Sequence, residues 1–336
     1  MDREQNLRDS YNERLPLFNR ACSNVTEALN IFLAENNIPY LAITSRVKEF
    51  ESFYEKIDRK NYSDALNENE DFCGARIILY YQNDIKKVVE IISNEFHVQE
   101  IEDKGTKLDV NEFGYRSHHF IVKFKDEWLT SPNYRGLNNI KVEIQVRTIL
   151  MHAWAEIEHK LGYKNKEQVP SDLKRKLFMI SAKLEEADGQ FQDLKSNIED
   201  YKNEIISVSN KKGKFVAKEF NLNSFQALLD FYFPKLEKDL VSTTKLFLLI
   251  QERQIPLSSI IDFAEKIQPY ITLINEYIHG KGSPKLTSQS NVMSYAIEAL
   301  FMNDEEAKAV SSASRIKITR DLKRLMSSTA DNTGVK

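Results

Sequence analysis

Glu143, Gln145 and Arg147 alternate with branched apolar residues over positions 142–148. Successive side chains of a β-strand point to opposite faces, so these three polar groups would share one face of a strand. A carboxylate, an amide and a guanidinium side by side suit the binding of a nucleotide and a metal ion. A sheet with one face in water gives the same alternation, and this segment alone does not separate the two interpretations.

A second carboxylate, Asp71, stands at the start of another strand-like stretch, residues 72–81. Mg²⁺ usually takes one or two protein carboxylates and fills its other positions with water and substrate oxygens. Asp71 and Glu143 are therefore the candidate ligands for one Mg²⁺ that bridges phosphate groups. On its own, Asp71 is also a common residue for a turn or a helix cap.

A group of cationic side chains lies within the first sixty residues. Lys48, Ser52 and Lys56 follow one another at four-residue steps, which predicts one face of a helix over residues 45–60. Together with Arg46 they offer a planar fork, two point charges and a hydroxyl, a set that can clamp a triphosphate. Glutamates are interleaved with these cations, and a solvated helix face is the alternative interpretation.

An aromatic ring and an imidazole frame the strand-like stretch 117–124. Tyr115 follows a glycine just before this stretch and can present its ring for stacking on a nucleobase. His119, within the stretch, can contribute to holding the same nucleotide. Tyrosine is also common at the start of a strand because of its β-propensity. Tyr115 and His119 therefore indicate a nucleotide site only in combination with the other candidate residues.

A helix predicted directly after residue 148 places His152, Glu156 and His159 on one stripe. Such a stripe can be considered as a metal site. It lacks the His-Glu-x-x-His order of zinc proteases, and no further ligand is evident nearby in the sequence. A zinc site is therefore disfavoured here.

These candidate residues require a sheet with helices around it. Strand-like stretches fall at residues 72–81, 96–101, 117–124 and 140–148, with helices expected at about 4–35, 45–60 and 85–94. This order predicts an α+β fold with a mixed β-sheet flanked by helices, followed by an all-α C-terminal region. We expect one domain over residues 1–170 that carries all the candidate site residues.

Beyond that domain the pattern is helical throughout. Apolar residues step by four and three from Leu173 to Ile205, which predicts one long heptad-patterned helix over residues 171–208 that packs its seam on another helix. The stretch 209–214 is the expected linker. A helical domain over residues 215–326, with helices at 225–233, 236–251 and 259–277, and a flexible tail over 327–336 complete the expected organisation.

Bulk composition narrows the class of protein. The 336 residues carry a net charge of −3 and are 41% hydrophobic, so the chain is expected to be globular, without a global attraction for nucleic acid. No apolar run approaches the ~20 residues that span a membrane, and the sequence after Met1 does not resemble a secretory signal. Cys22 and Cys73 are expected to be buried, reduced thiols, and the expected location is cytoplasmic.

Taken in order, the motifs resemble the synthetase domain of the RelA/SpoT family of alarmone synthetases. The resemblance covers about residues 40–165 and rests on four motifs: Ser45-Arg46-Val47-Lys48 with Ser52 and Lys56, Asp71-x-x-Gly74-x-Arg76, Gly114-Tyr115-x-Ser117-x-His119, and Glu143-x-Gln145-x-Arg147-Thr148 leading into Trp154-Ala155. It implies a nucleotidyltransferase-like sheet. It also implies transfer of the β,γ-pyrophosphate of ATP to the ribose 3′-hydroxyl of GDP or GTP, with Mg²⁺.

The resemblance also implies a role for each matching residue. Asp71 and Glu143 would be the catalytic pair and the metal ligands, with Glu143 as the base. The ATP-binding residues would be Arg46, Lys48, Ser52, Lys56 and Arg76, the last lying over adenine. Tyr115, His119 and Gln145 would hold the acceptor nucleotide.

Two departures from the family pattern leave the acceptor open. Asn111-Glu112-Phe113 replaces the usual Lys-x-Asn before Gly114, and His152 stands where Asp or Asn is common. The alternatives are a tRNA 3′-end pyrophosphokinase toxin of the same fold and a catalytically silent nucleotide-binding module. The toxin would need a surface for RNA, which either the basic stretch 315–324 or the lysines of residues 211–214 could provide. The C-terminal helices are candidates for homo-oligomer formation or for a regulatory partner.

Overall fold

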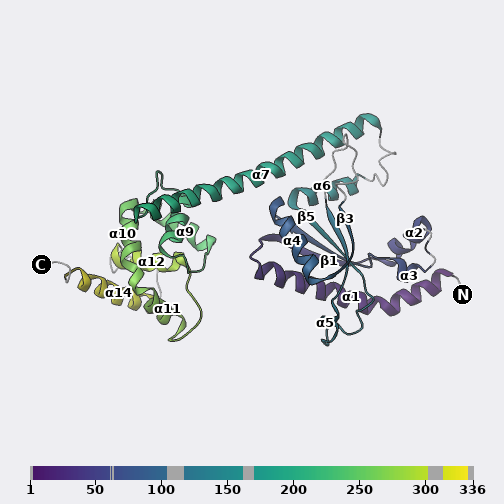
Figure 1. The fold of residues 1–336 in the computed structure, drawn as a ribbon, viewed down its shortest axis with the longest axis horizontal. Helices are drawn as coiled ribbons and strands as arrows, with labels where there is room; N and C mark the ends of the chain where they lie inside the picture. Colours follow the sequence, from purple (N-terminus) through teal and green to yellow (C-terminus); the bar gives the residue numbers. More distant parts are fainter. Residues whose placement is uncertain are drawn as a thin grey trace. The chain divides into compact units, whose positions relative to one another are not determined.

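The computed structural model describes residues 3–60, 62, 64–103, 117–161, 170–301 and 313–331. The chain divides into two compact units, Met1–Leu194 and Lys195–Lys336. The α+β fold predicted from the sequence is confirmed, because the first unit holds a five-stranded mixed sheet and the second is almost entirely helical (Figure 1).

The first unit consists of a sheet with helices on both faces. Its strands are β1 (Tyr40–Val47), β2 (Cys73–Leu79), β3 (His97–Asp103), β4 (His118–Lys123) and β5 (Val142–Thr148). Its helices are α1 (Arg3–Glu35), α2 (Phe50–Lys60), α3 (Ala65–Glu68), α4 (Gln82–Glu95), α5 (Asp126–Leu129), α6 (Ile149–Lys160) and the first part of α7 (Ser171–Lys212).

The strands lie in the order β1-β2-β5-β4-β3. The two central strands, β2 and β5, are parallel, and every other pair is antiparallel. The alternating pattern of β5 is confirmed: Val142, Ile144 and Val146 are buried, while Glu143 and Gln145 on the other face are partly exposed. The sheet therefore has one apolar face and one face with polar groups.

The apolar face of the sheet forms one core with α1 and α4. Phe18 of α1 stacks on Phe72 with ring centroids 4.6 Å apart, and Phe53 of α2 meets the same ring. Cys22 and Cys73 are both buried, and their thiols are not joined by a disulfide but share a hydrogen bond with the Sγ atoms 2.7 Å apart. The predicted burial of both cysteines is confirmed, and their reduced state stays a prediction.

One element of the first unit was predicted wrongly. Residues 45–47 are not helical but end β1, which pairs antiparallel with β2, and the helix α2 begins only at Phe50. The four-residue spacing of Lys48, Ser52 and Lys56 holds in α2 only for the last two. Pairing with β2, which lies about thirty residues away in sequence, decides the conformation of β1, and local spacing does not reveal it.

The second unit is a helical domain with its own core. It contains the end of α7 and the helices α8 (Leu222–Tyr232), α9 (Leu240–Glu252), α10 (Leu257–Ile267), α11 (Ile271–His279), α12 (Gln289–Leu300) and α14 (Ala313–Asp331), with a 3₁₀ turn η2 (Gln268–Tyr270). The expected helix 259–277 is broken at this turn, where Pro269 cannot donate the backbone hydrogen bond that a continuous helix needs.

Two expectations about α7 also need correction. The helix continues to Lys212, so most of the expected linker 209–214 is helical, and the turn comes at Gly213 with φ of 66°. Along the first part of α7 the described residues leave much of the heptad seam exposed, since Leu173, Ile180, Phe191 and Leu194 are each 42–56% exposed. The periodicity identified the apolar face of α7 correctly but not its environment.

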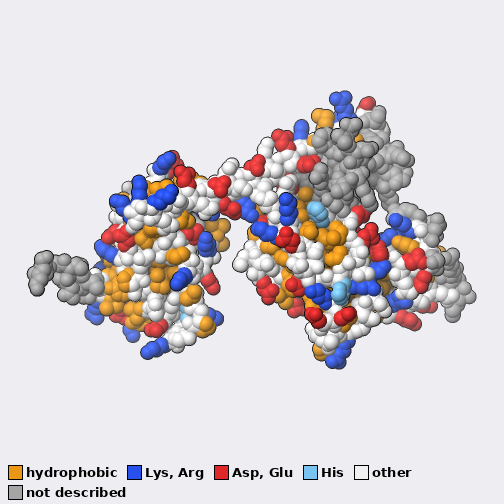
Figure 2. All heavy atoms as spheres, viewed as in Figure 1, with side chains coloured by type: hydrophobic (Ala, Val, Ile, Leu, Met, Phe, Trp, Pro, Cys, Tyr) orange, Lys and Arg blue, Asp and Glu red, His pale blue; other side chains and the backbone are white. Residues whose placement is uncertain are grey.

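None of the described helices combines the length and the apolar character that crossing a bilayer requires. On the face drawn in Figure 2, acidic and basic side chains are interspersed over both units. This mixed surface agrees with the small net charge of −3.

Candidate active site

The register of three neighbouring strands assembles a cavity on the polar face of the sheet. Gly74 of β2 lies opposite Glu143 of β5 and Arg46 of β1, while Arg76 lies opposite Gln145. Residues paired in this way point to the same face, so the alternation within each strand builds one polar surface across all three. The cavity has a volume of about 330 Å³. Its lining consists of Thr44, Ser45, Arg46, Lys48, Asp71, Gly74, Ala75, Arg76, Glu143, Gln145 and Glu156.

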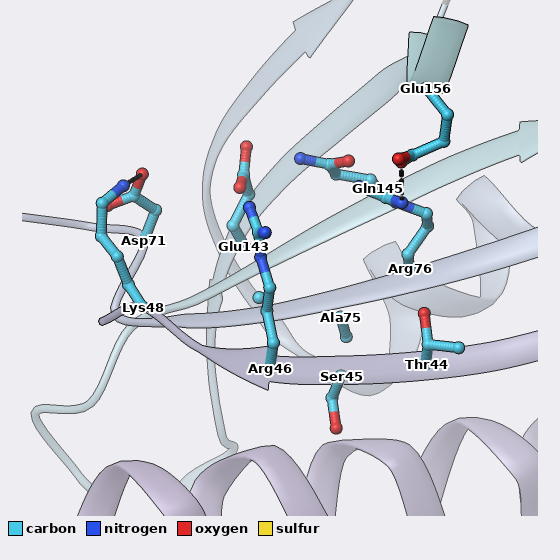
Figure 3. Close-up of a pocket in the computed structure, with 11 residues that line it drawn as sticks. Thr44, Ser45, Arg46, Lys48, Asp71, Ala75, Arg76, Glu143, Gln145 and Glu156 are labelled. Carbon is cyan, nitrogen blue, oxygen red and sulfur yellow. Dashed lines mark hydrogen bonds and ion pairs between the residues drawn. The ribbon is translucent and has the colours of Figure 1, made fainter. Parts of the chain in front are cut away.

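The lining side chains form two chemically different ends (Figure 3). Lys48 and Asp71 lie together at one end, and Arg76 and Glu156 lie together at the other. Arg46 and Glu143 stand between them. A ligand that spans the cavity would therefore contact cations and carboxylates at one end and in the middle, and a single ion pair at the other end.

Asp71 is held between two lysines. Its carboxylate accepts a hydrogen bond from Lys48 Nζ at 2.7 Å and pairs with Lys56 Nζ at 3.0 Å. Burial would raise the pKa of the Asp71 carboxyl, but the hydrogen bonds and charges of the two lysines outweigh it, so the pKa lies below its usual value. Asp71 is therefore ionised at neutral pH and available to a cation.

Glu143 is held from behind by a chain of two further side chains. Its Oε1 lies 2.9 Å from His119 Nδ1, and His119 Nε2 lies 2.8 Å from the hydroxyl of Ser117. Nδ1–H of the imidazole can donate to Glu143, while Nε2 shares a hydrogen bond with the Ser117 hydroxyl. Burial acts to raise the pKa of Glu143. The hydrogen bond and charge of His119 act to lower it, and together the lowering effects are larger, so the pKa lies below its usual value.

Two ionised carboxylates, Asp71 at one end of the cavity and Glu143 next to it toward the middle, fit a hard divalent cation. The charge of Asp71 acts to raise the pKa of Glu143, as repulsion between two nearby carboxylates does. Oxygen ligands of this kind and number suit Mg²⁺ that keeps water and phosphate oxygens in its other positions. No group of three or more His, Cys, Asp or Glu side chains that could hold a metal occurs among the described residues.

The other end of the cavity is closed by α6. Arg76 Nη1 donates to Glu156 Oε1 at 2.7 Å, and His152 Nδ1 lies 3.4 Å from the same nitrogen of Arg76. Two buried atoms of the cavity lining, Arg76 Nε at this end and Gln145 Oε1 between Arg76 and Glu143, have no hydrogen-bond partner among the described residues. Buried polar atoms without a partner are costly, so a ligand that supplies one would be stabilised here.

The position of α6 is fixed at its first turn. Thr148 is the N-cap of α6, and its Oγ1 accepts a hydrogen bond from Met151 N at 3.2 Å. The same hydroxyl donates to Asp188 of α7 at 2.6 Å, and Gln82 also donates to that carboxylate. A strand, a helix start and a distant segment of α7 therefore meet at one threonine.

Comparison with known proteins agrees with this geometry. A model of the region found in RelA/SpoT proteins matches residues 45–168. The GTP pyrophosphokinase YwaC of Bacillus subtilis is 32% identical over 153 residues, which are 44% of this chain and 70% of that protein. The chain belongs to the RelA/SpoT family. The GTP pyrophosphokinase YjbM of the same organism is 28% identical over 167 residues, 49% of this chain and 77% of the relative.

Solved structures of the RelA/SpoT family were matched as well. Small alarmone synthetase 1 from Bacillus subtilis gives a TM-score of 0.49 at 27% identity, covering 57% of this chain and 99% of that one. A GTP pyrophosphokinase family protein from Streptococcus pneumoniae gives 0.48 at 26%, covering 57% and 95%. The two sequence relatives, not these structures, confirm the predicted family and the predicted pyrophosphokinase class of enzyme, while the acceptor stays a prediction.

Only some of the residues in the RelA/SpoT motifs line the cavity. The predicted residues that line it are Arg46, Lys48, Asp71, Arg76, Glu143 and Gln145. Lys56 joins them through Asp71, whereas Ser52 is exposed on α2 and does not line the cavity. His119 is buried behind Glu143 with both ring nitrogens engaged. Tyr115 lies outside the described residues, and its role stays a prediction.

The sequence did not reveal the place of Glu156. It was considered only within a disfavoured zinc stripe, yet it closes one end of the cavity through its bond to Arg76. A signal was present in the helical spacing of His152 and Glu156, which puts both on one face of α6. Only the packing of α6 against β2 and β5 shows that this face meets Arg76.

Proposed function

We propose that this chain transfers the β,γ-pyrophosphate of ATP to the ribose 3′-hydroxyl of GDP or GTP. One observation carries the proposal: Asp71 and Glu143, both ionised, share a cavity with Arg46 and Lys48 on the face of the sheet that the family motifs predict. The names of the two Bacillus subtilis relatives, both GTP pyrophosphokinases, support the reaction class and the acceptor.

The cationic end of the cavity is the proposed site of the donor phosphates. Arg46 would offer a fork to a phosphate, and Lys48 and Lys56 would contribute point charges beside Asp71. Mg²⁺ held by Asp71 and Glu143 would neutralise charge on the phosphates. Positioning and charge neutralisation supply most of the catalysis in phosphoryl transfer, so this end would determine the rate.

The proposed chemical step uses Glu143 as the proton acceptor. The 3′-oxygen of the acceptor attacks the β-phosphorus of ATP, the bond from that phosphorus to the α–β bridging oxygen breaks, and AMP leaves. The hydroxyl proton passes to the Glu143 carboxylate, which its lowered pKa keeps ionised at neutral pH. His119 and Ser117 would hold this carboxylate in one orientation, and Gln145 would offer its unpaired Oε1 to the acceptor.

The experiment that tests the proposal is a transfer assay with Mg²⁺ and γ-labelled ATP, offering GDP, GTP and bulk tRNA in parallel. We expect label on the guanosine nucleotides, its loss in Glu143→Gln with ATP binding retained, and no change in Glu127→Gln, an exposed glutamate of α5. Label on tRNA alone would overturn the acceptor and favour the toxin alternative. No label on any acceptor would leave the silent binding module.

The structure weakens the basis for the tRNA alternative in one respect. Arg315, the first cation of the basic stretch, donates to Glu298, Asn291 and Ser294 within the helical unit, and its guanidinium lies 4.1 Å from the centre of the Tyr295 ring. A cation that is engaged in this way is not available to a phosphate backbone. Binding through several of the remaining cations would show as steep salt dependence, which the tRNA arm can measure.

We further propose that residues 215–326 act as a regulatory or assembly domain joined to the synthetase by α7. The proposal is supported by the separate core of the second unit and by the engagement of α7 with Thr148 beside the active site. Truncation after Gly213 tests this role: the transfer rate or the oligomeric state should change while the first unit stays folded, and a chain unchanged in both would contradict the proposal.

A further inference from the structure

The end of the cavity away from the lysines carries one carboxylate, and it comes from outside the sheet. Glu156 reaches the cavity from α6, while Asp71 and Glu143 belong to the opposite end and the middle (Figure 3). Its side chain is 49% exposed, and one oxygen, Oε1, accepts from Arg76. Each carboxylate oxygen accepts more than one hydrogen bond, so Glu156 has acceptor capacity left toward the cavity.

The environment of Glu156 keeps it an acceptor. Burial acts to raise its pKa, but the hydrogen bond and charge of Arg76 lower it more, and the net shift is downward. The facing titratable groups are Arg76, His152 and Arg147, and all three act on Glu156 in the same direction. At neutral pH the group is therefore a carboxylate, which accepts hydrogen bonds and donates none.

We propose that Glu156 selects adenine over 6-oxopurines in the pyrophosphate donor by accepting a hydrogen bond from the 6-amino group of the base. The inference rests on the proposed function, because donor phosphates at Lys48 and Asp71 place the base toward Arg76 and Glu156. An adenine presents a donor at position 6, whereas guanine and hypoxanthine present an oxygen there. That oxygen would face the carboxylate without a proton between them.

The selectivity expected from one such contact is substantial. A good hydrogen-bonded pair discriminates between bases by about 5- to 150-fold, and a site with a buried polar group left unpaired rejects the wrong ligand more strongly than an apolar site. Glu156 is partly exposed, so the lower part of this range applies, about tenfold. Arg76, held by the same carboxylate, keeps its planar guanidinium beside the base, where arginine stacks on aromatic rings.

The substitution Glu156→Gln separates base selection from simple support of Arg76. Glutamine keeps the shape and an oxygen that accepts from Arg76, but adds an NH₂ group that can donate to a 6-oxo group. The donors compared are ATP and inosine triphosphate, which differ only at position 6 and the adjacent ring nitrogen. Two readouts are taken for each: transfer of γ-label to saturating GDP, and direct binding by calorimetry with Mg²⁺, which requires no turnover.

We expect the native chain to prefer ATP over inosine triphosphate by about tenfold or more, and Glu156→Gln to bring this ratio close to one or reverse it. Glu156→Ala should lower the ratio without reversing it, and Glu127→Gln should leave it unchanged. An unchanged ratio in Glu156→Gln, or equal losses for both donors, would overturn the inference and leave Glu156 only as a support for Arg76. If the native chain transfers no label, the proposed function fails, while the binding ratios still decide the role of Glu156.

Discussion

Replacing Thr148 by valine should destabilise the first unit strongly, and far more than the same exchange at the exposed Thr130. Thr148 is fully buried, and valine has nearly the same shape. The exchange removes two hydrogen bonds at once: the N-cap bond from Met151 N at 3.2 Å and the bond to Asp188 Oδ2 at 2.6 Å. The first holds the start of α6, and the second holds α7 against it.

The magnitude follows from what each bond does. Loss of an N-cap costs about 0.5–2 kcal/mol, and loss of a hydrogen bond to a charged group costs about 1.5–3 kcal/mol. The free energy of unfolding should therefore fall by about 2–5 kcal/mol, a large share of the 5–15 kcal/mol typical of a domain. Asp188, only 2% exposed, would keep Gln82 as a side-chain donor at 3.3 Å.

Urea denaturation followed by tryptophan fluorescence measures this loss selectively. The chain has two tryptophans, Trp128 and Trp154, and both lie in the first unit, so the signal is blind to unfolding of the helical unit. The matched control is Thr130→Val, where an exposed hydroxyl donates to Glu127 O at 2.8 Å and the expected cost is below about 1 kcal/mol.

A double-mutant cycle with Asp188→Ala tests the contact itself. Once Thr148 is valine, removing the buried carboxylate should cost much less than in the native chain, and the coupling energy should reach at least about 1 kcal/mol. Losses that add to within about 0.5 kcal/mol would show that the two side chains act independently and would refute the reasoning.

The same contact has a defined pH dependence. Burial raises the pKa of Asp188, although the hydrogen bonds of Thr148 and Gln82 act to lower it. A folded-state pKa above the unfolded value means that the free energy of unfolding falls as pH rises from the ordinary value of 3.8 through the raised one. Thr148→Val removes a lowering contact and should extend that fall to higher pH, whereas Asp188→Asn should abolish it.

Three further predictions concern the active site and the division of the chain. Asp71→Asn should abolish transfer and weaken Mn²⁺ binding measured by paramagnetic resonance, and unchanged Mn²⁺ binding would remove Asp71 from the metal site. His119→Ala should lower kcat at least tenfold with little change in the KM for ATP, since the residue supports Glu143; a change confined to the KM for the acceptor would instead support direct contact with that nucleotide. Truncation after Gly213 keeps Asp188 and should leave the fluorescence midpoint of the first unit unchanged, whereas truncation after Leu184 removes the contact and should lower it.

Which side chains of one strand share a face could be predicted from the sequence. Alternation in β5 needs only the geometry of a strand, so Glu143 and Gln145 were assigned to one face correctly. The arrangement of Arg46 was not predictable in the same way. Its strand, β1, is fixed by pairing with β2, and the nearby cations have a helical spacing that points to the wrong local structure.

The limits of the pattern are clearest in α7. A four-three repeat specifies which side of a helix is apolar, and the structure keeps Leu173, Ile180, Phe191 and Leu194 on one stripe. The repeat carries no information on what covers that stripe, and these side chains are 42–56% exposed. A buried contact of α7 with the strand-to-helix corner is made by Asp188, a charged residue outside the apolar repeat, which hydropathy patterns would assign to the surface.

Thr148 connects three elements of the first unit at the strand-to-helix corner: β5, α6 and α7. On one side it closes the strand that carries Glu143, and on the other it caps the helix that carries Glu156. The ion pair between Arg76 and Glu156 joins that helix back to β2, so the corner, the helix and the sheet form a closed loop around the cavity. Because Asp188 of α7 binds the corner residue, any movement of α7 would act on the orientation of α6 before it acts on the lysines around Asp71. We therefore expect α7 to influence the binding of the donor base more strongly than the chemistry at Glu143, and Asp188→Asn should change the KM for ATP while leaving kcat nearly constant.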